Sequence, residues 1–255
     1  MTAGAASSPR RTLIRVIAAF MAVSAVAFGV FTIIFNILGP EQEIHAVHNA
    51  VVASLLLVLS APPAIQIVRD PDHPIRPMVM LGAVAIAGIG TMVAALTLDP
   101  FTLPFVVLIG VLWAIVPSRD GAFPIVGRPS PIMLGLLAVA AVPLLTYALG
   151  QAELQRTDQA SAHAAFFHWV EAAFYAVAVL LFGLLGALWP AEFRLATWCA
   201  GLALAILGAA SLVLGEHASA IGAPWSCAAL VGGVAFIAAG EWELRRAASA
   251  TRGAR

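Results

Sequence analysis

Apolar runs long enough to cross a lipid bilayer recur along the whole chain, separated by short polar turns. A helix that crosses the hydrocarbon core of a bilayer needs about 17 or more mostly apolar residues. Eight runs meet this length, and they extend over residues 13–38, 45–68, 77–98, 101–117, 132–150, 163–188, 195–215 and 220–240. The pattern predicts an all-α fold, a polytopic membrane helix bundle with eight transmembrane helices.

Composition supports a membrane environment and excludes several classes of protein. Of the 255 residues, 62% are hydrophobic and 10% are charged, and the mean hydropathy is +0.98. Soluble domains contain about 25% charged residues. The formal net charge is zero, so we expect the lipid bilayer and not nucleic acid as the partner. The chain has no lysine, which excludes a retinal Schiff base and a lysine nucleophile.

The thirteen arginines predict the orientation of the bundle. Positively charged residues near the ends of spans are retained on the cytoplasmic side of a membrane. If the first residue is inside, eight spans place twelve arginines on the cytoplasmic side and only Arg156 on the outer side. We therefore expect a multi-pass protein of the cell membrane with both its N- and C-termini in the cytoplasm. Association into a homo-oligomer or a larger membrane complex stays open.

Two halves of the chain resemble each other. The segment 38–41 after the first span recurs as 149–153 after the fifth, and His45-Ala-Val-His48 corresponds to His168-Trp-Val-Glu171. This pattern predicts a repeat of four spans whose copies are related by a pseudo-twofold axis along the membrane normal. The predicted parts are a cytoplasmic N-terminal tail (1–12), a first four-helix repeat (13–117), a cytoplasmic linker (118–131), a second four-helix repeat (132–240) and a cytoplasmic C-terminal tail (241–255).

The second and sixth spans carry the candidate chemistry near their outer ends. His45 and His48 are three residues apart, as are His168 and Glu171, so each pair lies on one face of its helix. Tyr175 continues the face of the sixth span one turn deeper. Because His48 and His168 lie at equal depth in equivalent spans, we expect the two faces to meet. Candidates for additional ligands, or for hydrogen-bond acceptors that fix the histidine tautomers, are Glu41, Glu43, His163 and His217.

Three imidazoles and one carboxylate favour a transition metal. Zn, Fe and Cu accept mixed nitrogen and oxygen ligands, whereas Mg and Ca prefer oxygen alone. The predicted metal ligands are His45, His48, His168 and Glu171. Alternatively, His48 and His168 hold a haem b between the second and sixth spans. A metal-free proton or substrate relay and a purely structural cluster are the other interpretations, and in an enzyme Glu171 and Tyr175 are the catalytic candidates.

The eight spans, the repeat and the histidines near the outer ends of the second and sixth spans resemble the haem A synthase family. In that family two related four-helix bundles hold haem through paired histidines. The resemblance implies a haem ligated by His48 and His168. The chain departs from the family at the fourth and eighth spans, which have no partner histidines, and around residues 41–48, which do not reproduce the family's Glu and His-Arg motif.

Three classes of function are compatible with this pattern. They are a membrane enzyme or redox protein with a metal or haem at its outer face, a proton- or metal-coupled transporter, and a non-catalytic subunit of a larger complex. The sequence has no HExxH or GxSxG motif, which argues against a hydrolase. Glu171 is the only acid placed inside a predicted span, which argues against ion transport. The pattern therefore favours the membrane enzyme or redox protein.

Overall fold

The computed structural model describes residues 9–38, 42–116, 128–215 and 219–253, and in these residues the regular structure is entirely helical. The all-α prediction is therefore confirmed for the described part of the chain. The helices are α1 (Pro9–Leu38), α2 (Gln42–Ser54), the π-helix η1 (Leu55–Ser60), α3 (Ala61–Arg69), α4 (Ile75–Ala94), α5 (Thr102–Ile115), α6 (Pro131–Thr157), α7 (Ala162–Ala165), α8 (His168–Leu188), α9 (Arg194–Val213) and α10 (Ala223–Gly253).

Seven stretches of helix are long and apolar enough to cross a membrane, so the chain has the character of a multi-pass membrane protein. They comprise α1, the continuous helix from α2 to α3, α4, α6, α8, α9 and α10. The prediction had eight spans. Its fourth, 101–117, corresponds to α5, which has only 14 residues. At 1.5 Å per residue α5 is about 21 Å long, shorter than the ~30 Å hydrocarbon core.

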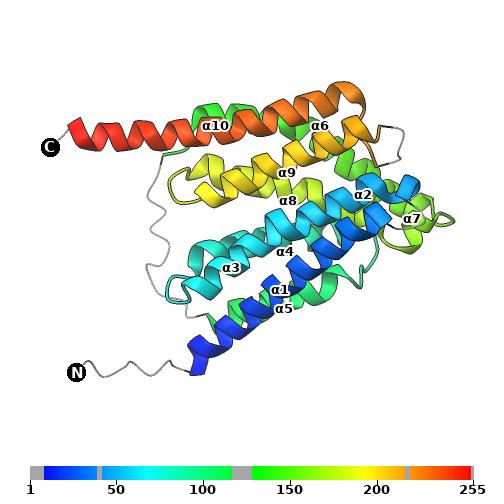
Figure 1. Cartoon of the computed structure of the whole chain (residues 1–255), viewed down its shortest axis with the longest axis horizontal. Helices are drawn as coiled ribbons and strands as arrows, with labels where there is room; N and C mark the ends of the chain where they lie inside the picture. The colour runs from blue at the N-terminus through cyan, green and yellow to red at the C-terminus, as the bar shows by residue number, and fades with distance from the viewer. Residues whose placement is uncertain (1–8, 39–41, 117–127, 216–218, 254–255) are drawn as a thin grey trace.

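We refer to α1 to α5 as the first group of helices and to α6 to α10 as the second group, by their order in the chain (Figure 1). In the first group α1 packs against the helix from α2 to α3, α3 packs against α4, and α4 against α5. In the second group α6 packs against α8, α8 against α9, and α9 against α10. Contacts of α4 with α8, and of α2 and η1 with α9, join the groups. The main core of buried apolar side chains extends through both groups and across this junction.

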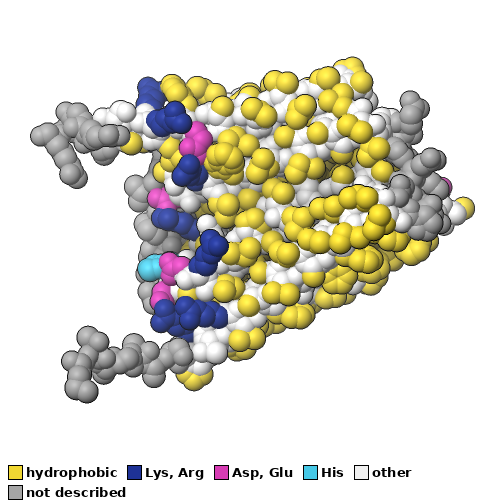
Figure 2. Space-filling model, viewed as in Figure 1, with side chains coloured by type: hydrophobic (Ala, Val, Ile, Leu, Met, Phe, Trp, Pro, Cys, Tyr) yellow, Lys and Arg dark blue, Asp and Glu magenta, His cyan; other side chains and the backbone are white. Residues whose placement is uncertain are grey.

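The two ends of the bundle differ in charge. In Figure 2 arginine and acidic side chains gather at the end where α1 begins and α10 ends, and apolar side chains cover the length of the helices. Ion pairs at this end join Arg11 to Asp72, Arg76 to Glu192 and Arg194 to Glu241. We call it the arginine end. The opposite end, where α2 and α7 lie, holds four of the five histidines that the structure describes, and we call it the histidine end.

The second predicted span is a helix with an altered middle. Leu55–Ser60 is a π-helix, and Pro62 and Pro63 follow it after Ala61. Proline has no N–H group for the carbonyl four residues earlier, so two carbonyls lose their α-helical partners. The Ser60 hydroxyl donates a hydrogen bond to the carbonyl of Leu55 at 2.9 Å. The π-helix therefore shifts the register of the chain between its histidines and the half that leads to the arginine end.

The sixth predicted span, 163–188, is not one helix. The short helix α7 ends at Ala165 and α8 begins at His168, with Phe167 between them in the left-handed region at φ 63° and ψ 16°. A non-glycine residue with positive φ reverses the local direction of the chain at a cost of about 1–2 kcal/mol. The predicted ends of other spans also move, because α6 continues from 150 to Thr157 and α10 continues through the predicted tail to Gly253.

Candidate metal centre

Four imidazoles and one carboxylate come together at the histidine end. His45 and His48 are supplied by α2, His163 by α7, and His168 and Glu171 by α8. His45, His48 and His163 are buried, with exposed fractions of 5%, 3% and 8%. The side chain of Glu171 is 14% exposed. Buried histidines and carboxylates are uncommon unless they pair with each other or bind a ligand, so this arrangement requires a physical account.

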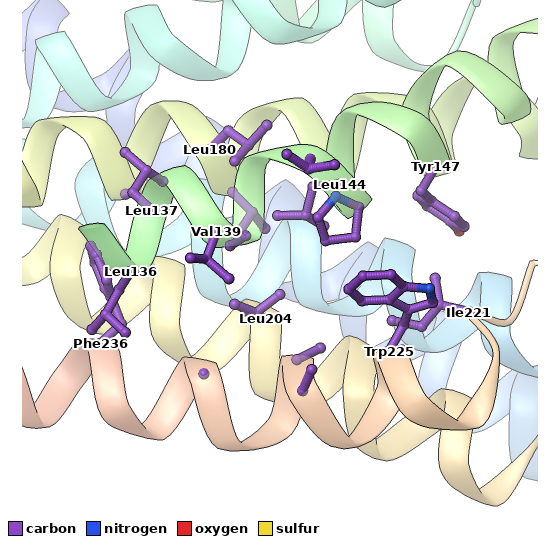
Figure 3. Close-up of a pocket in the computed structure, with 18 of the residues that line it drawn as sticks. Leu136, Leu137, Val139, Leu144, Tyr147, Leu180, Leu204, Ile221, Trp225 and Phe236 are labelled. Atoms are coloured by element: carbon purple, nitrogen blue, oxygen red, sulfur yellow. The ribbon is translucent and has the colours of Figure 1, made fainter. Parts of the chain in front are cut away.

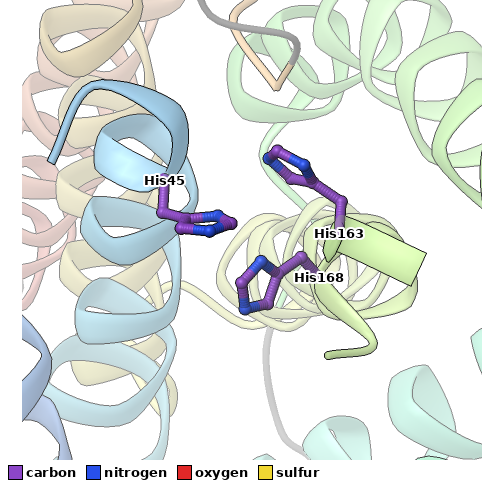
Figure 4. A group of neighbouring side chains, drawn as sticks. All are labelled: His45, His163 and His168. Atoms are coloured by element: carbon purple, nitrogen blue, oxygen red, sulfur yellow. The ribbon is translucent and has the colours of Figure 1, made fainter. Parts of the chain in front are cut away.

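Three of the histidines form the first potential ligand set. One ring nitrogen each of His45, His163 and His168 lies within 4.8 Å of the others. The ring centroid of His45 is 4.7 Å from that of His163 and 4.7 Å from that of His168, and those of His163 and His168 are 5.6 Å apart. In Figure 4 the three rings project from their helices toward a common space. Three side-chain ligands around one point are the number that catalytic zinc sites use.

His48, His168 and Glu171 form a second set that shares His168 with the first. Their ligand atoms also lie within 4.8 Å of one another. Nε2 of His48 is 3.1 Å from Oε2 of Glu171, close enough for an ion pair when the ring is protonated. The imidazole of His48 stacks on that of His168, with centroids 3.7 Å apart and an angle of 23° between the rings. The expected meeting of the two helix faces is therefore confirmed.

Aromatic and polar neighbours surround the cluster. Trp169 stacks on His163 with centroids 4.5 Å apart and 19° between the rings, and Phe166 stacks on His168 at 5.8 Å. Asp99, which precedes α5 and is 1% exposed, accepts hydrogen bonds from the Phe101 amide and the Thr102 hydroxyl. Its carboxylate is close enough to Glu171 for an electrostatic interaction. The centre therefore has a second carboxylate nearby, which the sequence analysis did not include.

The Tyr175 hydroxyl is engaged below the cluster. It donates a hydrogen bond to the carbonyl of Ala203 at 2.5 Å and lies 3.0 Å from the hydroxyl of Ser54. These contacts join α8 to α9 and to the end of α2, the helix that supplies His45 and His48. Tyr175 is fully buried. The geometry gives it a positioning role, and its predicted catalytic role stays a prediction.

The structure brings together all four predicted metal ligands and adds His163. If 163–188 were a continuous helix, His163 and His168 would lie on different faces, because five residues correspond to about 500° of rotation. The break at Phe167 is what places both rings at one centre. His73, at the arginine end, is 80% exposed and pairs with Asp70 at 3.0 Å. The other suggested ligands, Glu41, His217 and the side chain of Glu43, lie outside the described residues.

Comparisons with known proteins found no match for this chain. The sequence matches no family model, and neither a curated protein nor a solved structure matches it. The resemblance to the haem A synthase family gains no support from these comparisons. The function is therefore inferred from the geometry of the cluster and from the helices that hold it.

Proposed function

We propose that the chain is a membrane protein that binds one transition metal ion through His45, His163 and His168 and uses it in a redox or metal-dependent reaction at the histidine end. The observation that carries the proposal is the convergence of three imidazoles from three separate helices on one point. Imidazole nitrogens suit Zn, Fe and Cu. Packing alone gives no reason to place three polar rings together when apolar side chains would fill the same space without desolvating ring nitrogens.

Ring nitrogens without a partner support a bound ion. Among the described residues, Nδ1 of His48 and Nδ1 of His168 are buried and have no hydrogen-bond partner. A buried nitrogen left unsatisfied costs about 1–3 kcal/mol. Coordination of an ion by His168 would remove one such cost.

A metal ion is favoured over the haem alternative by the stacking of His48 on His168. Their centroids, 3.7 Å apart, are at the ordinary contact distance of two rings. Two histidines that ligate one haem iron bind it end-on through a ring nitrogen from opposite faces of the porphyrin, so their rings cannot be in direct contact with each other. Haem at these two residues would therefore require α2 and α8 to move apart.

The residues beside the ion are suited to moving a proton. The ion, when bound, would supply Lewis-acid or redox chemistry. Glu171 lies 3.1 Å from Nε2 of His48, where its carboxylate can accept a hydrogen bond from the ring N–H and so set the tautomer of that ring. Stacking places His48 directly against the ligand His168. The pair of His48 and Glu171 can then take up or release a proton next to the reacting group, and Tyr175 holds α8 in position against α2 and α9.

A transporter is a weaker alternative, because the middle of the bundle has no ionisable route. Between the histidine and arginine ends, the span-length helices carry no Asp, Glu, His, Lys or Arg. Ion and proton pathways through membranes use such side chains, or polar cavities in their place. Chemistry confined to the histidine end is the simpler interpretation.

We further propose eight crossings, with α5 as the short fourth. The start of α5 lies at the histidine end, where Phe101 approaches Phe167 with centroids 6.5 Å apart. Its last residue, Ile115, accepts a hydrogen bond from Arg10 at the arginine end. With α5 crossing, both ends of the chain face the side of the arginines, which the positive-inside rule assigns to the cytoplasm.

The contacts between the two groups of helices support the proposed repeat of a four-span unit. A parallel repeat makes the second span equivalent to the sixth and the third equivalent to the seventh. Contacts of α4 with α8 and of α2 with α9 then form one symmetry-related pair, and the contact of α2 with α8 lies at the pseudo-twofold axis. The four clustered histidines and Glu171 lie at this contact of α2 with α8, so the potential ligands come from both halves of the chain.

The proposal is tested by metal analysis of the purified protein together with its absorption spectrum. We expect close to one transition metal ion per chain and no Soret band. Reconstitution with Co²⁺ should give visible bands typical of nitrogen ligation, which His168→Ala should abolish while His73→Ala leaves them unchanged. A preparation that takes up no Zn, Fe, Cu or Co, or one that carries stoichiometric haem, would overturn the proposal.

A further inference from the structure

An apolar cavity of about 340 Å³ lies in the second group of helices, between α6, α8, α9 and α10 (Figure 3). Its walls are almost wholly apolar and include Leu137, Leu144, Leu180, Leu204 and Phe236. The cavity exists because α6 and α10 make few contacts with each other, whereas both pack closely on α8 or α9. It belongs to neither ligand set of the metal centre.

The cavity borders the face of the bundle that would meet lipid. Its lining residues Val139, Val142 and Trp225 have exposed fractions of 75%, 67% and 53%. All three are large apolar side chains on helices long enough to cross a membrane. A hydrophobic molecule dissolved in the bilayer can therefore enter sideways between α6 and α10 without crossing water.

A row of polar side chains continues from this cavity to the histidine end along one face of α6. Tyr147 lines the cavity, and Gln151 and Gln155 follow it at intervals of four residues. The Tyr147 hydroxyl donates to the carbonyl of Ser219 at 3.0 Å. Gln155 donates to the carbonyl of Ala164 on α7, next to the ligand His163, also at 3.0 Å. The row extends over about 12 Å, from apolar cavity to metal centre.

Other polar atoms in and beside this row lack partners. Within the described part of the chain, the side-chain oxygens of Gln151, Gln155 and Ser219 and the indole nitrogen of Trp169 are buried without a hydrogen bond. All four residues are at most 5% exposed. Buried polar groups in folded proteins are nearly always satisfied, so four orphans in one region indicate a ligand or ordered water. The two glutamine oxygens accept hydrogen bonds, and they therefore select a group that donates them.

We propose that the cavity and the polar row together bind a single-chain amphiphile with an uncharged, hydroxyl-bearing head. The apolar chain lies in the cavity, and the hydroxyl donates to Gln151 or Gln155 beside the histidine centre. This inference names the substrate class of the proposed metal centre and rests on that proposal for the reaction, although the binding itself is independent of the ion.

The test is photolabelling of the full-length protein in lipid nanodiscs with a 16-carbon alcohol that carries a diazirine near the end of its chain. The alkane of the same length, with the same diazirine, is the control probe. We expect the alcohol to label peptides that contain Leu137, Leu204 and Phe236 in preference to other lipid-facing segments, and the alkane to label them about tenfold less, the discrimination of one lost hydrogen bond.

Two variants test separately the cavity that would bind the apolar chain and the glutamine that would bind the hydroxyl. A side chain at Gly232 has room, since a Cβ there meets only Leu204 at 3.9 Å, and Gly232→Leu should fill the cavity and reduce alcohol labelling about tenfold. Gly110→Leu, on α5 where a Cβ meets nothing within 4 Å, is the matched control and should leave labelling unchanged. Gln151→Leu should remove the preference for the alcohol over the alkane.

The outcomes also distinguish this inference from the metal proposal. His168→Ala should lose the metal and keep the labelling, whereas Gly232→Leu should lose the labelling and keep the metal. Labelling spread evenly over the lipid-facing surface, an equal response of the two glycine variants, or an alcohol preference that survives both Gln151→Leu and Gln155→Leu would each overturn the proposed amphiphile site, whatever the metal content.

Discussion

The imidazole of His48 stacks on the imidazole of His168 with ring centroids 3.7 Å apart, although 120 residues separate the two in the sequence. This contact joins the first group of helices to the second. It also connects the two potential ligand sets, because His168 belongs to both.

The first prediction concerns which three histidines bind the ion. We expect His45→Ala, His163→Ala and His168→Ala each to lower metal content at least tenfold, because each removes one of three ligands. Metal per chain is measured by mass spectrometry of the purified variants, with the exposed His73→Ala as the control. Loss of metal in His48→Ala together with retention in His163→Ala would place the ion in the second set.

The second prediction concerns the pair of His48 and Glu171. Removing one partner of a buried pair leaves the other without compensation, so His48→Ala should destabilise the protein by about 3 kcal/mol. Glu171→Gln removes the charge and keeps the shape. The double variant should therefore be less destabilised than the sum of the two single changes, as measured by unfolding in detergent. Strict additivity of the two changes would mean that the pair makes no energetic contribution.

The third prediction concerns the left-handed conformation of Phe167. Glycine adopts positive φ without the steric cost that alanine has there. Phe167→Gly and Phe167→Ala lose the same aromatic side chain, yet the glycine variant should be more stable by about 1 kcal/mol. Thermal unfolding of the two variants side by side is sufficient. A more stable alanine variant would indicate that α7 and α8 form one continuous helix, and His163 would then leave the centre.

The fourth prediction concerns the close packing of α9 on α10. A Cβ on Gly233 would approach the carbonyl oxygen of Gly201 to 2.3 Å, and a Cβ on Gly208 would approach the Ser226 carbonyl to 2.5 Å. Gly233→Val and Gly208→Val should therefore destabilise the protein by about 1–3 kcal/mol through overpacking. Gly110→Val should have little effect, because a Cβ there has open space. Equal effects at all three positions would point to helix propensity alone.

The fifth prediction concerns topology. Reporter fusions after Asp72 and after Gly253 should read as cytoplasmic, and a fusion after Ala160 should read as external, because eight crossings alternate between the two sides. The short helix α5 decides the outcome. If α5 does not cross, residues 72 and 160 will report the same side, and the histidine and arginine ends of the second group of helices will be exchanged relative to the membrane.

The sequence was most informative where local chemistry dominates. Inside a bilayer no water is present to hydrogen-bond the backbone, so a long apolar run forms a helix. Seven of the eight predicted spans accordingly correspond to span-length helices. The spacing of His45 and His48, and of His168 and Glu171, was sufficient to place each pair on one helix face. The equal depth of His48 and His168 was sufficient to predict that they lie close together.

The sequence was least informative where the backbone departs from a regular helix. Nothing in the residues around Phe167 marks a left-handed conformation, since glycine and asparagine are the usual indicators and neither is present. The ligand His163 was consequently only one of several candidates. Likewise, Pro62 and Pro63 predict a disturbance of the second span but not the π-helix that precedes them.

By itself the sequence determined the class of the protein, an all-helical multi-pass membrane bundle, and the helix faces on which its polar chemistry lies. Hydrophobicity and a period of 3.6 residues act within one segment and can be read there. Only the tertiary structure decided which helix faces meet and that α7 turns His163 toward His168. It also decided that α6 and α10 leave a cavity beside polar side chains whose oxygens have no hydrogen-bond partner. These features depend on the packing of side chains from distant segments, and the residue pattern within a single helix does not specify that packing.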